Sequence, residues 1–231
     1  NTNDKVLTLA SGESVDYDQL VLATGSQSNK FGWPGQDLPG VQTLFSYQDL
    51  ELMEENSELT NHAVLVGGGL IGVEMAEMLL SRGIEVTFLV REDRFWGNIL
   101  PNGEAQLIQK HAEIHGIKFH FETELKEIKA GSNGRVSSVI TSTGEEIACD
   151  MVGLSAGVHP NIGVAQKGDI PVGRGILVND FLETQVPDVY AVGDCAEIEV
   201  LDGRNRIEPL WYTGKMQGEA LAKTIVGERT K

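Results

Sequence analysis

Gly67, Gly69 and Gly72 follow the apolar run 63–66 and satisfy the spacing G-x-G-x-x-G. In such a turn the first glycine permits a tight exit from a strand, and the second lets a pyrophosphate approach the backbone. The third lets the following helix pack closely on the strand. The N-terminus of that helix offers backbone N–H groups and a positive partial charge to phosphates. The three glycines therefore predict a dinucleotide-binding turn, with a glycine-rich packing turn as the alternative.

The segments around this turn have the order that the motif requires. The run 63–66 reads as a strand, and apolar residues recur at helical spacing between Ile71 and Leu79. Gly83 suits the end of a helix, and residues 84–90 read as a second strand. Strand, glycine turn, helix and strand together have the size of about one βαβ unit of 30 residues. The context therefore strengthens the dinucleotide interpretation.

The charged residues after the second strand bear on the choice between NADH and NADPH. An acidic residue there bonds the adenine-ribose 2′-hydroxyl of NAD, whereas a nearby arginine accommodates the 2′-phosphate of NADP. In this chain Val90 stands where the acid would be, and Arg91 follows it, which favours NADPH. In the alternative, Glu92 bonds the ribose and Arg91 stacks on the adenine. A solvated charged turn is the third interpretation.

The other segments predict a mixture of helices and strands. They comprise strands at 5–10 and 17–22 around a turn, a linker or domain crossing at 26–40, an acidic helix at 46–57, a helix at 103–115 with Asn102 as its N-cap, an alternating segment at 117–122, three antiparallel strands at 125–130, 135–142 and 146–154, short strands at 176–179 and 189–192, and a closing helix at 213–226.

The composition excludes several classes of protein. With 34 acidic against 18 basic side chains, the formal charge of −16 disfavours nucleic acid and an anionic membrane surface as partners. The apolar stretch from Ala63 to Leu80 is interrupted by glycines and acids, so it predicts no membrane span. No signal peptide is visible. The cysteines, Cys149 and Cys195, are too few for a disulfide framework, which indicates a reducing, cytoplasmic location with both thiols buried.

Other motifs of catalysis are absent from the sequence. His111 and His115 have the i, i+4 spacing of metal ligands on a helix, but no third ligand is evident, so we expect no metal site. There is no G-x-S-x-G nucleophile motif, and no Tyr-x-x-x-Lys pair supports a short-chain dehydrogenase. No side chain is assigned as a catalytic acid or base.

Four motifs in order make the chain resemble the FAD-dependent pyridine nucleotide oxidoreductases. They are the ATG motif within Leu22–Gly25, the fingerprint Gly67–Glu77, the segment Ala156–Asn161, and the segment from Thr184 to Asp194. Within that family the chain resembles reductases of the NAD(P)H:nitrite reductase and rubredoxin reductase type. The resemblance covers nearly the whole chain and is more specific than one glycine motif.

For the nicotinamide cofactor, the resemblance implies roles around the fingerprint. Gly67, Gly69 and Gly72 would carry the NAD(P)H pyrophosphate, and Leu70 and Ile71 between them would also belong to the cofactor site. Glu74 would orient the nicotinamide carboxamide, and Gly157 would pack against the bound cofactor. Leu70 stands where some members place a tyrosine over the flavin, so that tyrosine is missing here.

For FAD, the resemblance implies a second set of residues. Thr24 and Gly25 would lie at the crossing from the FAD domain to the NAD domain. Asp194, preceded by Gly193, would bond a ribitol hydroxyl of FAD, and the alternative for Asp194 is an ordinary helix N-cap. Trp211 and Tyr212 would lie close to the flavin ring, with packing as the alternative for Trp211.

The expected fold class is α/β. A Rossmann-like NAD(P)-binding domain at 40–157, with an antiparallel three-stranded extension, would be flanked by an incomplete FAD-binding domain at 1–39 and 158–231. The family's first fingerprint, which binds FAD, would lie upstream of Asn1, and its C-terminal interface domain would follow residue 231. We therefore expect the chain to bind NAD(P)H and to hold FAD weakly or not at all.

The resemblance implies a redox activity for the parent protein. Hydride would pass from NAD(P)H to FAD, and electrons would continue to an acceptor protein or a small acceptor, while this piece alone would be inactive. A non-catalytic dinucleotide-binding module, regulatory or partner-binding, is the alternative from another class.

Overall fold

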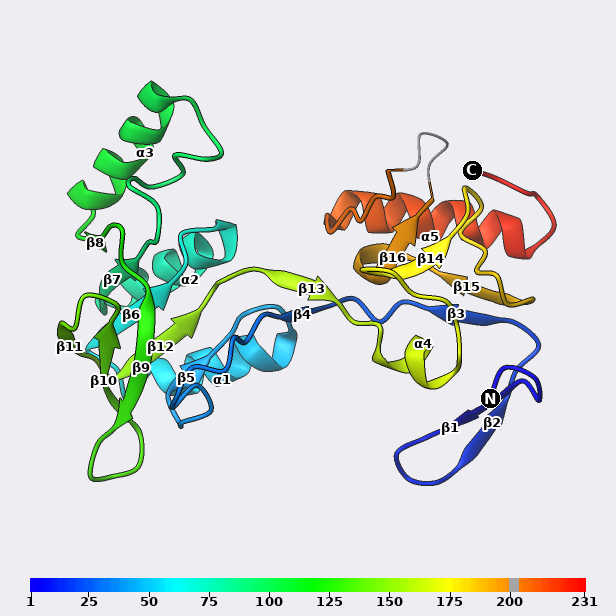
Figure 1. Cartoon of the computed structure of the whole chain (residues 1–231), viewed down its shortest axis with the longest axis horizontal. Coiled ribbons are helices and arrows are strands. Elements are labelled where there is room, and N and C mark those ends of the chain that lie inside the picture. The colour runs from blue at the N-terminus through cyan, green and yellow to red at the C-terminus, as the bar shows by residue number, and fades with distance from the viewer. Residues whose placement is uncertain (200–203) are drawn as a thin grey trace. The chain divides into compact units, whose positions relative to one another are not determined.

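The computed structural model describes residues 1–199 and 204–231, and it divides into two compact units (Figure 1). The central unit is formed by residues 28–158, and the flanking unit by residues 1–27 and 159–231. The chain passes from one to the other through β4 (Ser26–Ser28) and β13 (Val158–Pro160). The assignment of these units to particular cofactors stays a prediction.

The segment 28–39, which the sequence places in the first flank, belongs to the central unit. Trp33 and Leu38 pack against an apolar cluster of that unit. The carbonyl oxygen of Pro34 accepts a hydrogen bond from the Ile128 N–H at 2.8 Å, and that of Pro39 accepts one from the Val136 N–H at 3.0 Å. Residues 28–39 are therefore an ordered strap, and the chain crosses between the two units just before it, at residues 27–28.

A five-stranded parallel sheet forms the core of the central unit. Its strand order is β5 (Val41–Gln42), β12 (Met151–Leu154), β6 (His62–Val66), β7 (Glu85–Leu89) and β8 (Lys118–His120). The chain runs from β6 outward to β7 and β8, and it later returns to place β12 on the opposite side of β6. The continuous apolar runs of β6 and β12 are typical of strands that are buried on both faces. The predicted α/β class and the βαβ unit are confirmed.

Three helices accompany this sheet: α1 (Tyr47–Ser57), α2 (Leu70–Ser81) and α3 (Asn102–Ile114). Helix α1 begins with a capping box in which the Ser46 hydroxyl accepts from the Asp49 N–H and the Asp49 carboxylate accepts from the Ser46 N–H. Helix α3 already includes Asn102, and Pro101 occupies its N-cap without a side-chain cap. The N-cap predicted at Asn102 is therefore wrong by one position.

The antiparallel extension consists of β9 (Leu125–Ala130), β10 (Val136–Thr141) and β11 (Glu146–Ala148), in the order β11-β10-β9. The predicted third strand, 146–154, is wrong because it is two strands: β11 ends the extension and β12 enters the parallel sheet. The Asp150 carboxylate accepts hydrogen bonds from the N–H groups of Asn61 and His62, at 2.9 and 3.2 Å. These bonds hold the point at which the chain passes from the extension into the parallel sheet.

Short strands, two α-helices and one 3-10 helix build the flanking unit, as far as the structure describes it. They are β1 (Val6–Thr8), β2 (Ser14–Asp16), β3 (Leu20–Leu22), β14 (Ile176–Val178), β15 (Val189–Ala191), the 3-10 helix η1 (Gly193–Cys195), β16 (Ala196–Ile198), α4 (Gly163–Lys167) and α5 (Trp211–Ile225).

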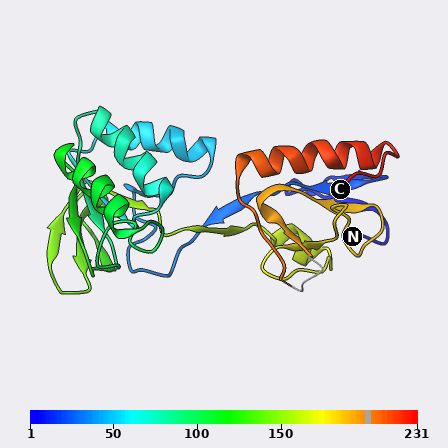
Figure 2. The same ribbon diagram turned by 90° about the horizontal axis from the view of Figure 1, so that it is seen from above.

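The strands predicted at 5–10 and 17–22 do not pair with one another. Strand β1 pairs with β2, whereas β3 pairs in parallel with β15. The reason is that the apolar strand Leu20–Leu22 finds its hydrogen-bonding partner, β15, far along the chain. Helix α5 lies over the strands of its own unit (Figure 2) and contributes Leu221 to their buried cluster.

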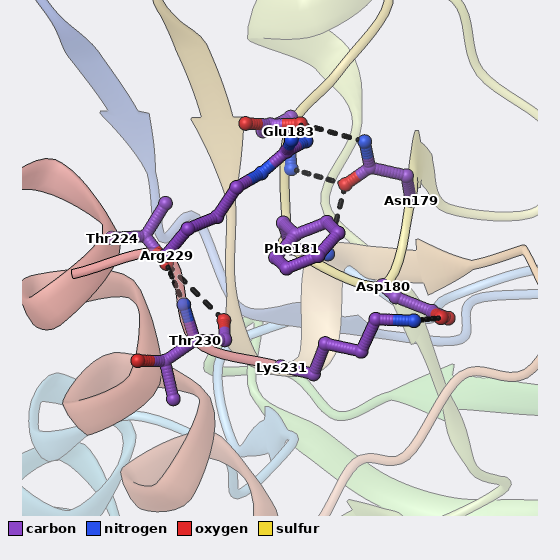
Figure 3. Close-up of polar contacts among 8 residues, drawn as sticks. All are labelled: Asn179, Asp180, Phe181, Glu183, Thr224, Arg229, Thr230 and Lys231. Carbon is purple, nitrogen blue, oxygen red and sulfur yellow. Dashed lines mark hydrogen bonds and ion pairs between the residues drawn. The ribbon is translucent and has the colours of Figure 1, made fainter. Parts of the chain in front are cut away.

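The residues after α5 pack on the loop 179–183 (Figure 3). The guanidinium carbon of Arg229 lies 4.0 Å from the ring centroid of Phe181, and the Lys231 Nζ lies 5.2 Å from it. Arg229 also pairs with Glu183 at 2.8 Å, and Lys231 pairs with Asp180 at 2.7 Å. Residues 229–231 are thereby held against the flanking unit by two cations that share one aromatic ring.

Both cysteines are buried and unpaired, as predicted. Burial raises the pKa of the Cys149 thiol to about 12, so this thiol is not a nucleophile at neutral pH. Over residues 1–199 and 204–231, the structure contains no helix with the length and apolar character needed to cross a bilayer.

Candidate functional site

A cavity of about 590 Å³ opens in the central unit where the carboxyl ends of β6, β7 and β12 meet. From β6 the chain crosses to β7 on one side, whereas β12, on the other side of β6, follows only after β11. In open α/β sheets such a reversal of strand order creates a crevice beyond the strand ends, where ligands bind. The cavity is lined by the glycine turn 67–69, residues 89–92 and 96–99 after β7, residues 123–125, the segment 155–157, and the side chains of Phe31, Trp33 and Val66.

Glycine occurs at positions 67, 69 and 72 of the turn for different physical reasons. Gly67 has φ +98°, and a Cβ there would lie 2.7 Å from the Ser155 carbonyl oxygen. A Cβ on Gly72 would lie 2.7 Å from the Gly67 carbonyl oxygen. Gly69 has an ordinary φ of −77°, and a Cβ there would meet only the Ser155 oxygen, at 4.0 Å. The fold therefore requires glycine at 67 and 72, but it does not require glycine at 69.

The open position at Gly69 coincides with the start of α2. Gly69 is the N-cap of this helix and provides no side chain to satisfy its first N–H groups. The first turn also carries no acidic residue. A helix N-terminus of this kind favours an anion, so the cradle around Gly69 fits the pyrophosphate of a dinucleotide.

Arg91 and Glu92 lie together at the cavity wall. The Arg91 Nε donates to Glu92 Oε1 at 2.9 Å, and the Arg91 side chain is 75% exposed. The hydrogen bond to Glu92 raises the pKa of Arg91 above its ordinary value. Because exposed pairs contribute only about 0–1 kcal/mol, a ligand can recruit either partner at little cost.

Ser155 ties the turn to the sheet, although sequence reasoning did not select it. Its hydroxyl donates to the carbonyl oxygens of Gly67 and Val66, at 2.7 and 3.0 Å. Nearby, Gly157 has φ +85°, and the Asn29 Nδ2 donates to the Ala156 carbonyl oxygen at 3.1 Å. The only sequence signal for Ser155 is a small polar residue directly after an apolar strand.

The structure brings together some of the predicted nicotinamide-side residues. Gly67, Gly69, Arg91, Glu92 and Gly157 all line the cavity.

Four other predicted residues lie outside the lining. Leu70 is 65% exposed, and Glu74 is exposed on α2. Ile71 packs on the apolar cluster beneath the helix, and Gly72 is buried below the turn. The roles assigned to these residues stay predictions.

The predicted flavin-side residues lie in the flanking unit. The Thr24 hydroxyl donates to the Asn161 carbonyl oxygen at 2.6 Å, and the Ser26 hydroxyl donates to the Asp194 carboxylate at 3.0 Å. Asp194 lies within η1, whose N-cap is Val192, so the helix N-cap role considered for Asp194 is wrong.

The rest of the predicted flavin side also lies in this unit. The N–H of Gly193, which has φ +75°, donates to Gln217 Oε1 at 2.7 Å. Gly25 has φ +66°. Trp211 and Tyr212, at the start of α5, are 72% and 76% exposed.

The imidazole rings of His111 and His115 lie with their centroids 4.3 Å apart on α3. In the part of the chain that the structure describes, no group of three or more His, Cys, Asp or Glu side chains is placed to hold a metal ion.

The model of the pyridine nucleotide-disulphide oxidoreductase family matches residues 1–218. The chain belongs to this family. The resemblance that the motifs indicated is therefore confirmed, and members of this family bind FAD and NAD(P)H.

Individual members support the same placement. The chain is 32% identical to the nitrite reductase [NAD(P)H] of Bacillus subtilis over 231 residues, which is all of this chain and 28% of that protein. It is 33% identical to the rubredoxin-NAD(+) reductase of Acinetobacter baylyi over 216 residues, which is 93% of this chain and 54% of that protein. The crystal structure of a ferredoxin reductase from Rhodopseudomonas palustris superposes with a TM-score of 0.91 at 28% identity, over all of this chain and 57% of that one. The chain thus spans between 28% and 57% of the length of these three oxidoreductases.

Proposed function

We propose that this member of the family is the NAD(P)H-binding part of a flavoprotein reductase, in which hydride passes from NAD(P)H to FAD and electrons continue to a protein or small acceptor. The observation that carries the proposal is Gly69: neither its backbone conformation nor its neighbours need a glycine, whereas a phosphate approaching the start of α2 does. The names of the relatives support an acceptor protein such as a rubredoxin.

In this proposal the protein binds and orients, and the nicotinamide and flavin supply the redox chemistry when bound. The N–H groups at the start of α2 hold the pyrophosphate, and Arg91 and Glu92 contact the adenosine ribose. Glu74 and Gly157 orient the nicotinamide end. The residues of the flanking unit that would contact bound FAD are Thr24, Gly25, Gly193 and Asp194. No side chain needs to act as a general acid or base.

Arg91→Ala tests which nicotinamide cofactor the site prefers. We expect NADPH to bind about 10- to 100-fold more weakly, because hydrogen bonds to a charged group contribute about 1.5–3 kcal/mol each. NADH should be affected by less than about threefold, because it lacks the 2′-phosphate. Calorimetric titration of both nucleotides measures the difference. The matched control is Arg82→Ala, which removes one charge at the far end of α2; equal losses of both nucleotides in Arg91→Ala would contradict the role.

Flavin content tests the second half of the proposal. Over residues 1–199 and 204–231, α2 is the one α-helix that begins directly after a glycine-rich turn at a strand end. We therefore expect purified protein of residues 1–231 to bind NADPH, to carry far less than stoichiometric FAD, and to reduce no dye. Absorbance at the flavin maximum and a dye-reduction assay with added FAD measure this. A yellow, stoichiometric flavoprotein would contradict it, whereas full-length protein that binds NADPH but reduces no dye would favour the non-catalytic module.

A further inference from the structure

The loop after β7 is bonded to the middle of the glycine turn. The Trp96 indole N–H donates to the Gly68 carbonyl oxygen at 2.6 Å, across 28 positions of sequence. Trp96, Gly97, Asn98 and Ile99 all line the cavity. The loop is therefore part of the cavity wall and is directly coupled to the turn at its base.

The fingerprint does not explain why the residue at position 68 is a glycine, but its surroundings do. In G-x-G-x-x-G this position is unrestricted. Here a Cβ at Gly68 would lie 2.8 Å from the Phe95 ring carbon Cε2. Two residues of the loop thus contact Gly68. The Phe95 ring occupies the space that a side chain at position 68 would need, and the Trp96 indole donates to the Gly68 carbonyl oxygen. Position 68 is a glycine because the loop is seated on it.

The backbone of Trp96 is itself constrained. Its φ of +56° lies in the left-handed region, which a bulky side chain adopts only when its surroundings impose it. Its carbonyl oxygen accepts from the N–H groups of Ile99 and Leu100, both at 3.0 Å. Its ring stacks on that of Phe95, with centroids 5.7 Å apart. Side chain, carbonyl and backbone conformation together fix residues 96–100 at the cavity wall.

We propose that Trp96 is a positioning residue for the adenosine half of the nucleotide. The inference rests on the proposed NAD(P)H site and deepens it. The loop leaves the carboxyl end of β7, where the adenosine ribose binds in this fold, and it adjoins Arg91 and Glu92 in the cavity lining. By bonding Gly68, Trp96 keeps the ribose-side wall at a fixed distance from the phosphate turn, so that one ligand contacts both.

The test compares Trp96→Phe with wild type for NADPH and for 2′-phospho-ADP-ribose. Phenylalanine keeps an aromatic ring but loses the N–H donor, and we expect about tenfold weaker binding of both ligands, the size of one lost hydrogen bond. The two losses should be equal, because 2′-phospho-ADP-ribose contains the whole adenosine half of NADPH, 2′-phosphate included, but no nicotinamide. Trp211→Phe makes the same substitution at an exposed tryptophan that is not among the residues lining the cavity, and it should cost less than about threefold. The thermal midpoint of each variant shows whether the fold is retained.

A spectroscopic measurement keeps Trp96 in place. The chain has three tryptophans, Trp33, Trp96 and Trp211, so the double variant Trp33→Phe/Trp211→Phe leaves Trp96 as the only one. Its emission should change saturably with 2′-phospho-ADP-ribose, with the Kd that calorimetry gives. Wild type that binds neither ligand would overturn the proposed function. If wild type binds both ligands, three results would overturn this inference alone. They are an unchanged affinity of Trp96→Phe for both ligands, a loss of affinity confined to NADPH, or an emission of Trp96 that does not change on binding.

Discussion

Replacing Gly69 with alanine is expected to weaken NADPH binding by at least about 30-fold, while the free energy of unfolding changes by less than about 1 kcal/mol. The affinity falls because a Cβ at this position enters the cradle at the start of α2 and separates the phosphate from charge-assisted hydrogen bonds. Stability is retained because φ is −77° and the nearest protein atom to that Cβ, the Ser155 oxygen, is 4.0 Å away. Calorimetric titration and urea unfolding measure the two quantities.

Gly67→Ala is the matched control, since it is the same substitution two residues earlier. There the Cβ meets the Ser155 carbonyl oxygen at 2.7 Å, and φ is +98°. We expect a loss of about 2–5 kcal/mol in the free energy of unfolding, from strain together with overpacking. If Gly69→Ala lowers stability as much as Gly67→Ala, or binds NADPH like wild type, the assignment of Gly69 to the phosphate is wrong.

Local patterns were sufficient to predict the elements that depend on neighbours in sequence. The βαβ unit follows from an apolar run, three glycines and a helical repeat, all within residues 63–90. The start of α1 follows from Ser46 and Asp49, which satisfy one another's backbone N–H groups. In both cases the interactions that decide the structure span only a few positions.

The errors arise where distant segments decide the pairing. The apolar Leu20–Leu22 run looks like the second strand of a hairpin, but its partner is β15, which follows it by more than 160 positions. The segment 146–154 looks like one strand, but its second half is claimed by β6. Strand propensity records how well a side chain fits a pleated surface and does not specify the neighbour.

The residues of the candidate site fall into the same two groups, those that local sequence indicates and those that distant contacts decide. The glycines and the charged pair at 91–92 have motif positions, so the sequence indicates them. Ser155 and Trp96 act through single hydrogen bonds to turn carbonyl oxygens, across 88 and 28 positions. No spacing rule connects such pairs, and only the fold reveals that the residues supporting the turn come from two other strand ends.

Phe88→Ala is expected to lower the free energy of unfolding by about 3–5 kcal/mol, a large part of the 5–15 kcal/mol that holds a typical domain together. Phe88 is fully buried in β7. Its ring stacks on Phe119 at 5.5 Å between centroids and contacts Phe95 at 5.6 Å. Urea unfolding followed by circular dichroism measures the loss, and Phe88→Leu, which keeps most of the volume, should cost less than about 2 kcal/mol.

The same variant separates general stability from support of the site. A Cβ on Gly72 would lie 3.0 Å from the Phe88 ring, so Phe88 forms the floor on which the first turn of α2 rests. Phe119 shares the aromatic cluster, at 4.9 Å from Phe95, but it does not reach Gly72 in this way. At a temperature well below its thermal unfolding midpoint, Phe88→Ala should therefore weaken NADPH binding by about tenfold, since misplacing the α2 N–H groups costs about one hydrogen bond. Phe119→Ala should lower the free energy of unfolding with little effect on the affinity for NADPH. Equal affinities in the two variants would show that the floor beneath Gly72 does not position the phosphate turn.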